Sequence, residues 1–331
     1  MSKAKTVSRR AAPAYEVPEP VVIPADVDRT PASLLQLACK LSLTSGQFID
    51  TKFYAYSRRK ISGEVYAPQP IYASSYLLRA RAPEYFEGLL VGGFKGRCIA
   101  APLNGPLPVE FPPETSGYES DSDIEDDDEL DSPLASAQTI PSSSALPATP
   151  GASAEGKQED RADDSEDAEA AALPGNIGQV CLMSNFAYPT WKAFVFYLYT
   201  GQIAFAPLKS QGNPSTGSSN LKPSRKDNYT PSPPLCSPKS MYRLADELGL
   251  NDLKALAKNA IGSKLSEQNI VTELLSTLTA RDQEIRDMEV GYAVSTGRQA
   301  VKRGISEWMN TMSAEELKQK ADIVAYIIQK F

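Results

Sequence analysis

The residues best placed for chemistry form an acidic run in the middle of the chain, residues 116–131 (SGYESDSDIEDDDELD). Three serines of this run, Ser116, Ser120 and Ser122, precede acidic residues, so we predict them as phosphorylation sites for acidophilic kinases. The dense negative charge could also attract basic partners such as histones, or mimic nucleic acid. The alternative is a solubilising spacer. Salt-sensitive binding that disappears when the run is deleted would separate the two interpretations.

Histidine, which catalytic and metal sites often require, is absent from the sequence. This absence excludes a Ser-His-Asp or Cys-His set and the usual zinc and haem ligands. No GxGxxG or GxxxxGK[ST] phosphate-binding loop occurs. We therefore predict that the chain is not an enzyme and that it binds no cofactor or metal.

The four cysteines, Cys39, Cys98, Cys181 and Cys236, are far apart in the sequence. No two of them have the spacing of a metal site. Because no secretion signal is recognisable, we expect four reduced thiols that are mostly buried.

Charge and hydropathy limit the partners and the compartment. The formal net charge is −7, but it is unevenly spread, because residues 118–169 hold 17 acidic residues and only two basic ones, Lys157 and Arg161. No segment approaches the roughly 20 apolar residues of a membrane helix, and the first residues lack the apolar region of a secretory signal. We expect an intracellular protein of the cytoplasm or nucleus, with neither membrane nor nucleic acid as a partner.

Three stretches lack the periodic apolar pattern of a folded segment: residues 1–30, 112–176 and 207–236. They are rich in Pro, Ser, Ala, Gly or acid, and such compositions bury too little apolar surface to offset the loss of chain entropy. We predict a disordered tail, a disordered acidic insertion and a Pro/Ser-rich loop.

Hydrophobic periodicity predicts the elements between these stretches. A helix should begin at Pro31 with Thr30 as its cap, and end at Gly46. A strand at 65–72 should be short and lie at a sheet edge, because Pro68 and Pro70 interrupt it. The other expected elements are a strand at 48–57, helices at 74–81 and 83–90, a strand at 179–183, a helix at 189–199, a strand at 202–205, a helix hairpin at 238–261, and further helices beyond Ser266.

This order and four motifs along it resemble the BTB/POZ domain, in particular the fungal form with loop insertions. Residues 48–53 (FIDTKF) look like the family's opening strand with its aspartate, and residues 73–90 (ASSYLLRARAPEYFEGLL) like its helix pair. Residues 194–201 (FVFYLYTG) match the Tyr-x-Tyr-Thr-Gly signature, and residues 241–260 resemble the closing helix hairpin. In one departure, Ser74 stands where the family usually has a histidine.

The resemblance implies an α+β fold, with a small mixed sheet flanked by short helices. The BTB/POZ-like domain would span residues 31–263, interrupted by the insertion 112–176 and the loop 207–236. A C-terminal helical extension would follow over residues 264–331. The aromatic residues of the motifs are expected to lie in the core, because aromatic side chains dominate burial; they are Tyr85, Phe86, Trp191, Tyr197 and Tyr199.

The resemblance also implies a function, that of a protein-interaction module acting as a homodimerising adaptor or scaffold. The helix with Leu34, Leu37 and Leu41 would then lie across the partner copy, with Asp50 at the interface. The alternatives are that this helix packs on its own sheet and that Asp50 bonds to nearby backbone.

A cullin-based ubiquitin ligase is a candidate partner, because many members of the family attach substrates to one. Such adaptors often carry a hydrophobic-x-Glu motif after the helix pair. Residues 92–113 match it poorly, since the single glutamate, Glu110, has Pro108 two residues before it. The alternative function is that of a phosphorylation-regulated acidic ligand for basic partners, through the acidic run.

Overall fold

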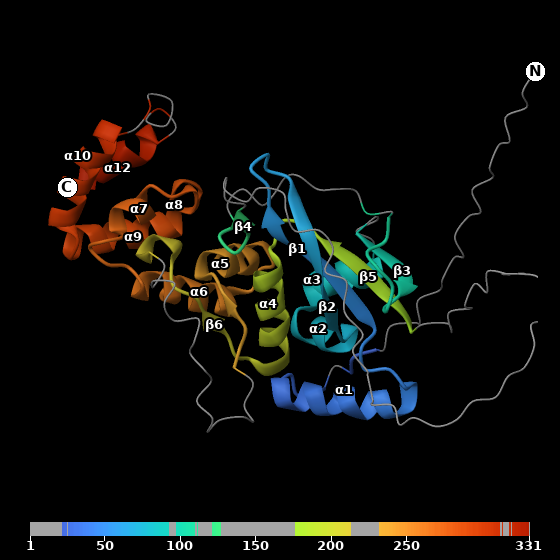
Figure 1. Ribbon diagram of the computed structural model, residues 1–331. Coiled ribbons are helices and arrows are strands. Elements are labelled where there is room, and N and C mark those ends of the chain that lie inside the picture. Colours follow the sequence, from blue (N-terminus) through green and yellow to red (C-terminus); the bar gives the residue numbers. More distant parts are fainter. Residues whose placement is uncertain are drawn as a thin grey trace, which may run out of the picture.

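The structure is a computed structural model in which a small sheet and its helices form one body and further helices follow at the C-terminal end (Figure 1). The residues that it describes are 22–24, 26–92, 97–109, 111, 121–126, 176–212, 232–311, 313, 318 and 320–330. The remaining parts of the predicted tail, insertion and loop lie outside the described residues, as do Ser116 and Ser120.

The sheet has the strand order β2-β1-β5-β3. Strand β1 (Thr51–Arg59) pairs antiparallel with β2 (Val65–Ala73) and parallel with β5 (Ile177–Met183), while β3 (Cys98–Pro102) pairs antiparallel with β5. A two-residue strand, β4 (Glu125–Asp126), runs parallel to β1 at its C-terminal end. The sheet is therefore mixed and small, as the sequence predicts.

The expectation of a short β2 is wrong, although its place at the sheet edge is confirmed. The strand keeps register with β1 through both prolines, with Pro68 opposite Tyr56 and Pro70 opposite Tyr54. Successive N–H groups of a strand point to opposite sides, so two prolines two residues apart remove donors from one side only. An edge strand needs donors on one side, which makes the prolines compatible with a nine-residue strand that pairs with β1 at eight positions.

Helices cover the sheet and begin and end largely where the sequence predicts. Helix α1 (Pro31–Ser45) is capped by the Thr30 side chain and ends at Gly46, whose φ of 71° is left-handed. The pair α2 (Ser75–Arg81) and α3 (Pro83–Glu87) leads into a π-helical turn, Gly88–Gly92. Helix α4 (Tyr188–Thr200) follows β5, and the hairpin α5 (Pro238–Glu247) and α6 (Asn251–Ser263) closes the body.

The core of this body is built around Trp191 of α4, which is fully buried. Its ring lies 5.4 Å from that of Phe53 on β1 and 5.2 Å from that of Phe194, measured between centroids. Phe86 of α3 packs at 6.3 Å on the same indole, so one aromatic cluster joins the sheet, the helix pair and α4.

The C-terminal helices form a second apolar cluster that the sequence predicts only in outline. It is centred on residues such as Ile270, Leu274, Ala293 and Val301. The contributing helices are α7 (Ile270–Leu274), α9 (Gln283–Ser295), α10 (Arg298–Thr311) and α12 (Ala321–Lys330), whereas α8 (Thr277–Arg281) places Leu278 in the core of the body. The architecture is thus α+β, with a small mixed sheet, flanking helices and a helical C-terminal part.

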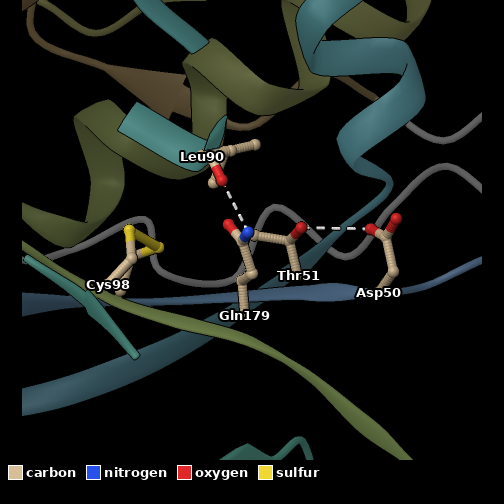
Figure 2. The surroundings of a disulfide bond; sticks show 6 residues. Asp50, Thr51, Leu90, Cys98 and Gln179 are labelled. Carbon is tan, nitrogen blue, oxygen red and sulfur yellow. Dashed lines mark hydrogen bonds between the residues drawn. A yellow bond between two sulfur atoms is a disulfide. The ribbon is translucent and has the colours of Figure 1, made fainter. Parts of the chain in front are cut away.

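The cysteine expectation is wrong in two respects. Cys98 and Cys181 form a disulfide between β3 and β5 (Figure 2), at positions that face each other in the strand register. They are 83 residues apart in the sequence, and β3 is not among the predicted strands, so their pairing could not be anticipated. Cys39 is an exposed free thiol, whereas Cys236 is a buried one.

Parts of the stretches expected to be disordered are ordered instead. Residues 121–126 of the acidic insertion pack against the body, and Ile124 is buried. In the Pro/Ser-rich loop, the 3-10 turn Lys209–Gln211 follows the buried Leu208, and β7 (Leu235–Cys236) pairs with β6 (Ala204–Phe205). Ile23 and Val27 of the tail pack against α1. In each of these short segments, one or two apolar side chains are buried or partly buried against the folded body.

Candidate interaction site

The segment Asp121–Asp126 attaches to the N-termini of two helices through two carboxylates. Asp121 accepts the backbone N–H of Ala187, the N-cap residue of α4, at 2.9 Å. Asp123 accepts the backbone N–H of Ser237, the N-cap residue of α5, with its two oxygens at 2.7 and 2.8 Å. The first N–H groups of a helix lack partners within the helix and attract negative charge. Each carboxylate therefore satisfies one helix N-terminus.

Hydroxyl groups of both helices complete this polar contact. Thr190 of α4 donates to Asp123 at 2.6 Å, and Ser240 of α5 donates to Asp121 at 2.6 Å. Ser122 lies between the two aspartates, and its hydroxyl is 2.5 Å from that of Ser237 and 3.1 Å from that of Ser240. Ser122, the one predicted phosphorylation site within the described residues, is thus held in a hydroxyl cluster in this state.

An apolar anchor and two arginines fix the rest of the segment. Ile124 is 1% exposed and packs in a cluster with Tyr54, Tyr56, Val65 and Leu182. Beyond it, β4 pairs with the free end of β1, where β5 no longer reaches. The side chains of the two paired positions form ion pairs: Arg59 with Asp126 at 2.6 Å, and Arg58 with Glu125 at 3.5 Å.

Burial sets the electrostatics of this contact. It raises the pKa of Asp123 to about 6, and the neighbouring Asp121 adds to the increase. The hydrogen bonds from Thr190 and Ser237 and the charge of Lys209 act in the opposite direction, because they stabilise the carboxylate. Attachment of Asp123 therefore removes a charged group from water at a cost that its hydrogen bonds only partly offset.

A polar pocket lies directly beside the attached segment. It is lined by Asp121 and Ser122 on one side and by Lys209, Ser210, Lys239 and Glu273 on another. Lys239 and Ser210 both contact the carboxylate of Glu273, which is almost fully buried. Behind them, burial raises the pKa of Glu289 to about 7, although Thr279 donates to it at 2.7 Å. The pocket thus joins the body to the C-terminal helices through buried polar groups.

Helix α1 presents two apolar faces, and the predicted interface residues Leu34, Leu37 and Leu41 all belong to the inner one. Leu34 is fully buried inside its own chain, against Tyr76, Leu77 and Ala80. Leu37 and Leu41 are half-buried at the rim of the same cluster. The outward face carries Leu35, Cys39 and Leu43, with Leu35 37% and Leu43 86% exposed. These three positions are four residues apart, so they form one stripe along the helix.

Asp50 bonds to nearby backbone, the alternative that the sequence left open. Its carboxylate accepts the backbone N–H of Ser75 at 2.7 Å and also the Ser75 hydroxyl, and so caps helix α2. The Tyr199 hydroxyl accepts the N–H of Ser74 at 2.5 Å. Of the other motif residues, Phe86 and Trp191 are fully buried, while Tyr85 and Tyr197 pack on the core with part of their surface exposed.

The sequence interpretation missed the most polar part of this site. The sequence shows Asp121 and Asp123 only as members of an acidic run, whereas their partners Ala187, Thr190, Ser237 and Ser240 lie at the starts of two distant helices. One signal was present: Ile124 is an isolated β-branched apolar residue inside a run of acid.

Comparisons with known proteins find no match, neither to a family model nor to a curated protein or a solved structure. Within the described ranges, no group of three or more His, Cys, Asp or Glu side chains is placed to hold a metal ion. No helix in the same residues combines the length and apolar content that spanning a bilayer requires.

Proposed function

We propose that this chain is a non-catalytic protein-interaction module of the BTB/POZ type, which forms a homodimer through helix α1. The order of elements supports the proposal: α1, the β1–β2 hairpin, the α2–α3 pair, β5, α4, β6 and the α5–α6 hairpin occur in this order, with β3 and β4 inserted before β5 and β7 before α5. This is the order of the domain that the sequence motifs resemble.

The observation that carries the dimer is the outward stripe of Leu35, Cys39 and Leu43. Leu34 and Ala38 already attach the helix to its own body, so the outward stripe is not needed for that attachment. Two-fold pairing is the commonest way in which a surface covers itself. Cys39 lies midway between the two leucines, so an antiparallel pair of α1 helices would place Leu35 opposite Leu43 and the two Cys39 thiols opposite each other.

Cys39 gives a direct test, because the other free thiol, Cys236, is buried. Mild oxidation of the full chain should yield a covalent dimer on a non-reducing gel, and Cys39→Ser should abolish it. A matched control moves the thiol to an exposed position on another face of the helix, in the double variant Cys39→Ser/Thr44→Cys, which should not cross-link. Light scattering at micromolar concentration should show a dimer that Leu43→Asp converts to a monomer. A monomeric parent would refute the dimer, and a Leu43→Asp variant that remains a dimer would refute the α1 interface.

Partner recruitment is the second half of the proposal, and the resemblance names a cullin as the candidate. Affinity purification of the tagged full chain, followed by mass spectrometry, should recover a cullin in amounts comparable to the bait. The tagged Trp191→Ala chain, which lacks the central core side chain, is the control for unfolded bait. Recovery of a cullin by neither or by both baits would contradict a cullin adaptor and leave the dimer to be judged by the cross-link.

A further inference from the structure

The segment Asp121–Asp126 has the properties of a bound peptide. It reaches the body between two stretches outside the described residues, 112–120 and 127–175. Its backbone adds a short strand to the free end of β1, which is a recurring mode of peptide recognition. Specific side chains supply the remaining contacts: two carboxylates, one apolar anchor and two further acids.

The receptor side of this contact belongs to the folded body. It consists of the N-cap amides of Ala187 and Ser237, the hydroxyls of Thr190 and Ser240, the apolar pocket around Ile124, and Arg58 and Arg59 at the end of β1. We call these residues the acidic-peptide groove. Each group of the groove selects one feature of the ligand, so the groove specifies the pattern Asp-x-Asp-Ile followed by two acids.

We propose that the acidic-peptide groove binds an acidic segment of a partner protein with this pattern, and that Asp121–Asp126 is a built-in competitor that keeps the groove closed. The inference goes beyond the proposed dimer and does not depend on it, because the groove and α1 use different surfaces. Charge complementarity supports it, since two helix N-termini and two arginines face the ligand.

The test uses the full chain with its own ligand disabled, in the triple variant Asp121→Asn/Asp123→Asn/Ile124→Ser. The probe is a fluorescent synthetic peptide with the sequence of residues 119–128, and anisotropy measures its binding. The variant should bind this peptide with micromolar affinity. A ligand tethered in the same chain acts at an effective concentration on the order of millimolar, so the parent chain should bind about 1,000-fold more weakly.

Two further arms separate recognition from simple charge attraction. A scrambled peptide of the same charge, and one with Ile replaced by Ser, should bind the triple variant at least about tenfold more weakly, because each lacks the correctly placed anchor. In the same background, Thr190→Val should weaken binding about tenfold, since one donor to the ligand is lost. Thr200→Val, at the exposed end of the same helix, is the matched control and should change nothing.

The outcome is decisive in either direction. A cooperatively folded triple variant that does not bind the peptide at millimolar concentration, or that binds the scrambled peptide equally well, overturns the proposal. If the triple variant does not fold, Ile124→Ala in the full chain takes its place, because it removes only the anchor. Failure of that folded variant to bind more peptide than the parent overturns the proposal in the same way.

Discussion

Two segments attach to opposite ends of helix α4, and they do so by different interactions (Figure 1). At the C-terminal end, α1 packs Leu34 and Ala38 into an apolar cluster, and the ring of Pro31 approaches Gly201. At the N-terminal end, Asp121 accepts the N-cap amide and one apolar residue, Ile124, provides the anchor. The attachment of α1 is therefore mainly apolar. The attachment of Asp121–Asp126 is mainly polar, with Ile124 as its apolar anchor.

This difference determines how the stability of each attachment responds to pH and to salt concentration. Apolar burial scales with the area removed from water and depends little on pH or on salt at moderate concentration. Contacts between carboxylates and helix N-termini depend on the charge of the carboxylate, and exposed ion pairs are screened by salt. We therefore expect α1 to be a permanent part of the fold, and Asp121–Asp126 to be an attachment that can be regulated.

The largest effect is expected for Leu34→Ala. Truncating a fully buried leucine should lower the free energy of unfolding by about 2–5 kcal/mol, measured by urea denaturation, because it leaves a cavity in the α1 attachment. The loss should be the same at low and high salt. Lys40→Ala, at an exposed position of the same helix outside the stripe of Leu35, Cys39 and Leu43, should stay within about 0.5 kcal/mol of the parent. Equal losses for the two variants would contradict the assignment of the faces.

For Ile124→Ala, we expect a smaller loss in the free energy of unfolding than for Leu34→Ala. The larger change should be in hydrogen exchange near the attached segment. The segment can detach without unfolding the body, so the cost to overall stability cannot exceed the free energy of attachment. Hydrogen exchange of the Ala187 and Ser237 amides should accelerate at least about tenfold, because both lose their carboxylate acceptors together. The amides of α1 serve as the internal control. Unchanged protection of Ala187 and Ser237 would show that Ile124 does not hold the segment.

The next prediction concerns pH. The pKa of Asp123 is raised to about 6 in the attached state and is close to its ordinary value of 3.8 when detached, so the attached state binds the extra proton. Attachment should therefore be strongest below about pH 4, weaken as pH rises to about 6, and then level off, by up to roughly 1.4 kcal/mol per pH unit in that interval. The protection of the Ser237 amide, corrected for the intrinsic exchange rate, measures this.

Asp123→Asn should remove most of this pH dependence, because an amide does not titrate in the interval. The other charged groups that face Asp123, namely Asp121 and Lys209, remain in the variant and report their own contribution. A pH profile identical in parent and variant would assign the titration to a different group.

The smallest effect is expected for Arg58→Gln. Its ion pair with Glu125 spans 3.5 Å and both side chains are exposed, so the loss should be about 0–1 kcal/mol in the free energy of attachment. Added salt should weaken the parent's attachment slightly and the variant's less. A loss as large as that of Ile124→Ala would mean that charge, and not the apolar anchor, dominates the contact.

The apolar attachment could be predicted from the sequence to a large extent, and the polar one could not. Thr30, Pro31 and Gly46 mark the ends of α1, and the spacing of Leu34 and Ala38 gives its inner face, because caps and periodicity are local properties. The partners of Asp121 lie 66 and 119 residues further along the chain, in α4 and α5. No local pattern contains that information, so composition alone led to a prediction of disorder.

The same distinction between local signals and contacts distant in the sequence separates the other features that could be predicted from those that could not. The caps and the aromatic core residue Trp191 follow from local signals, whereas the pairing of Cys98 with Cys181 requires a strand, β3, that composition does not reveal. The outward stripe of α1 does not follow from periodicity, because Leu35 and Leu43 look like ordinary surface positions once Leu34 defines the inner face.

The Cys98–Cys181 bond encloses the whole stretch that carries the acidic run within one covalent ring of the chain. A protease that cuts between these two cysteines would open the ring without separating the fragments. The chain would then carry a new amino terminus and a new carboxyl terminus and still migrate as one molecule until it is reduced. Cleavage on one side of Asp121–Asp126 would leave that segment tethered at a single end, so proteolysis could loosen the internal ligand while both halves of the sheet stay linked.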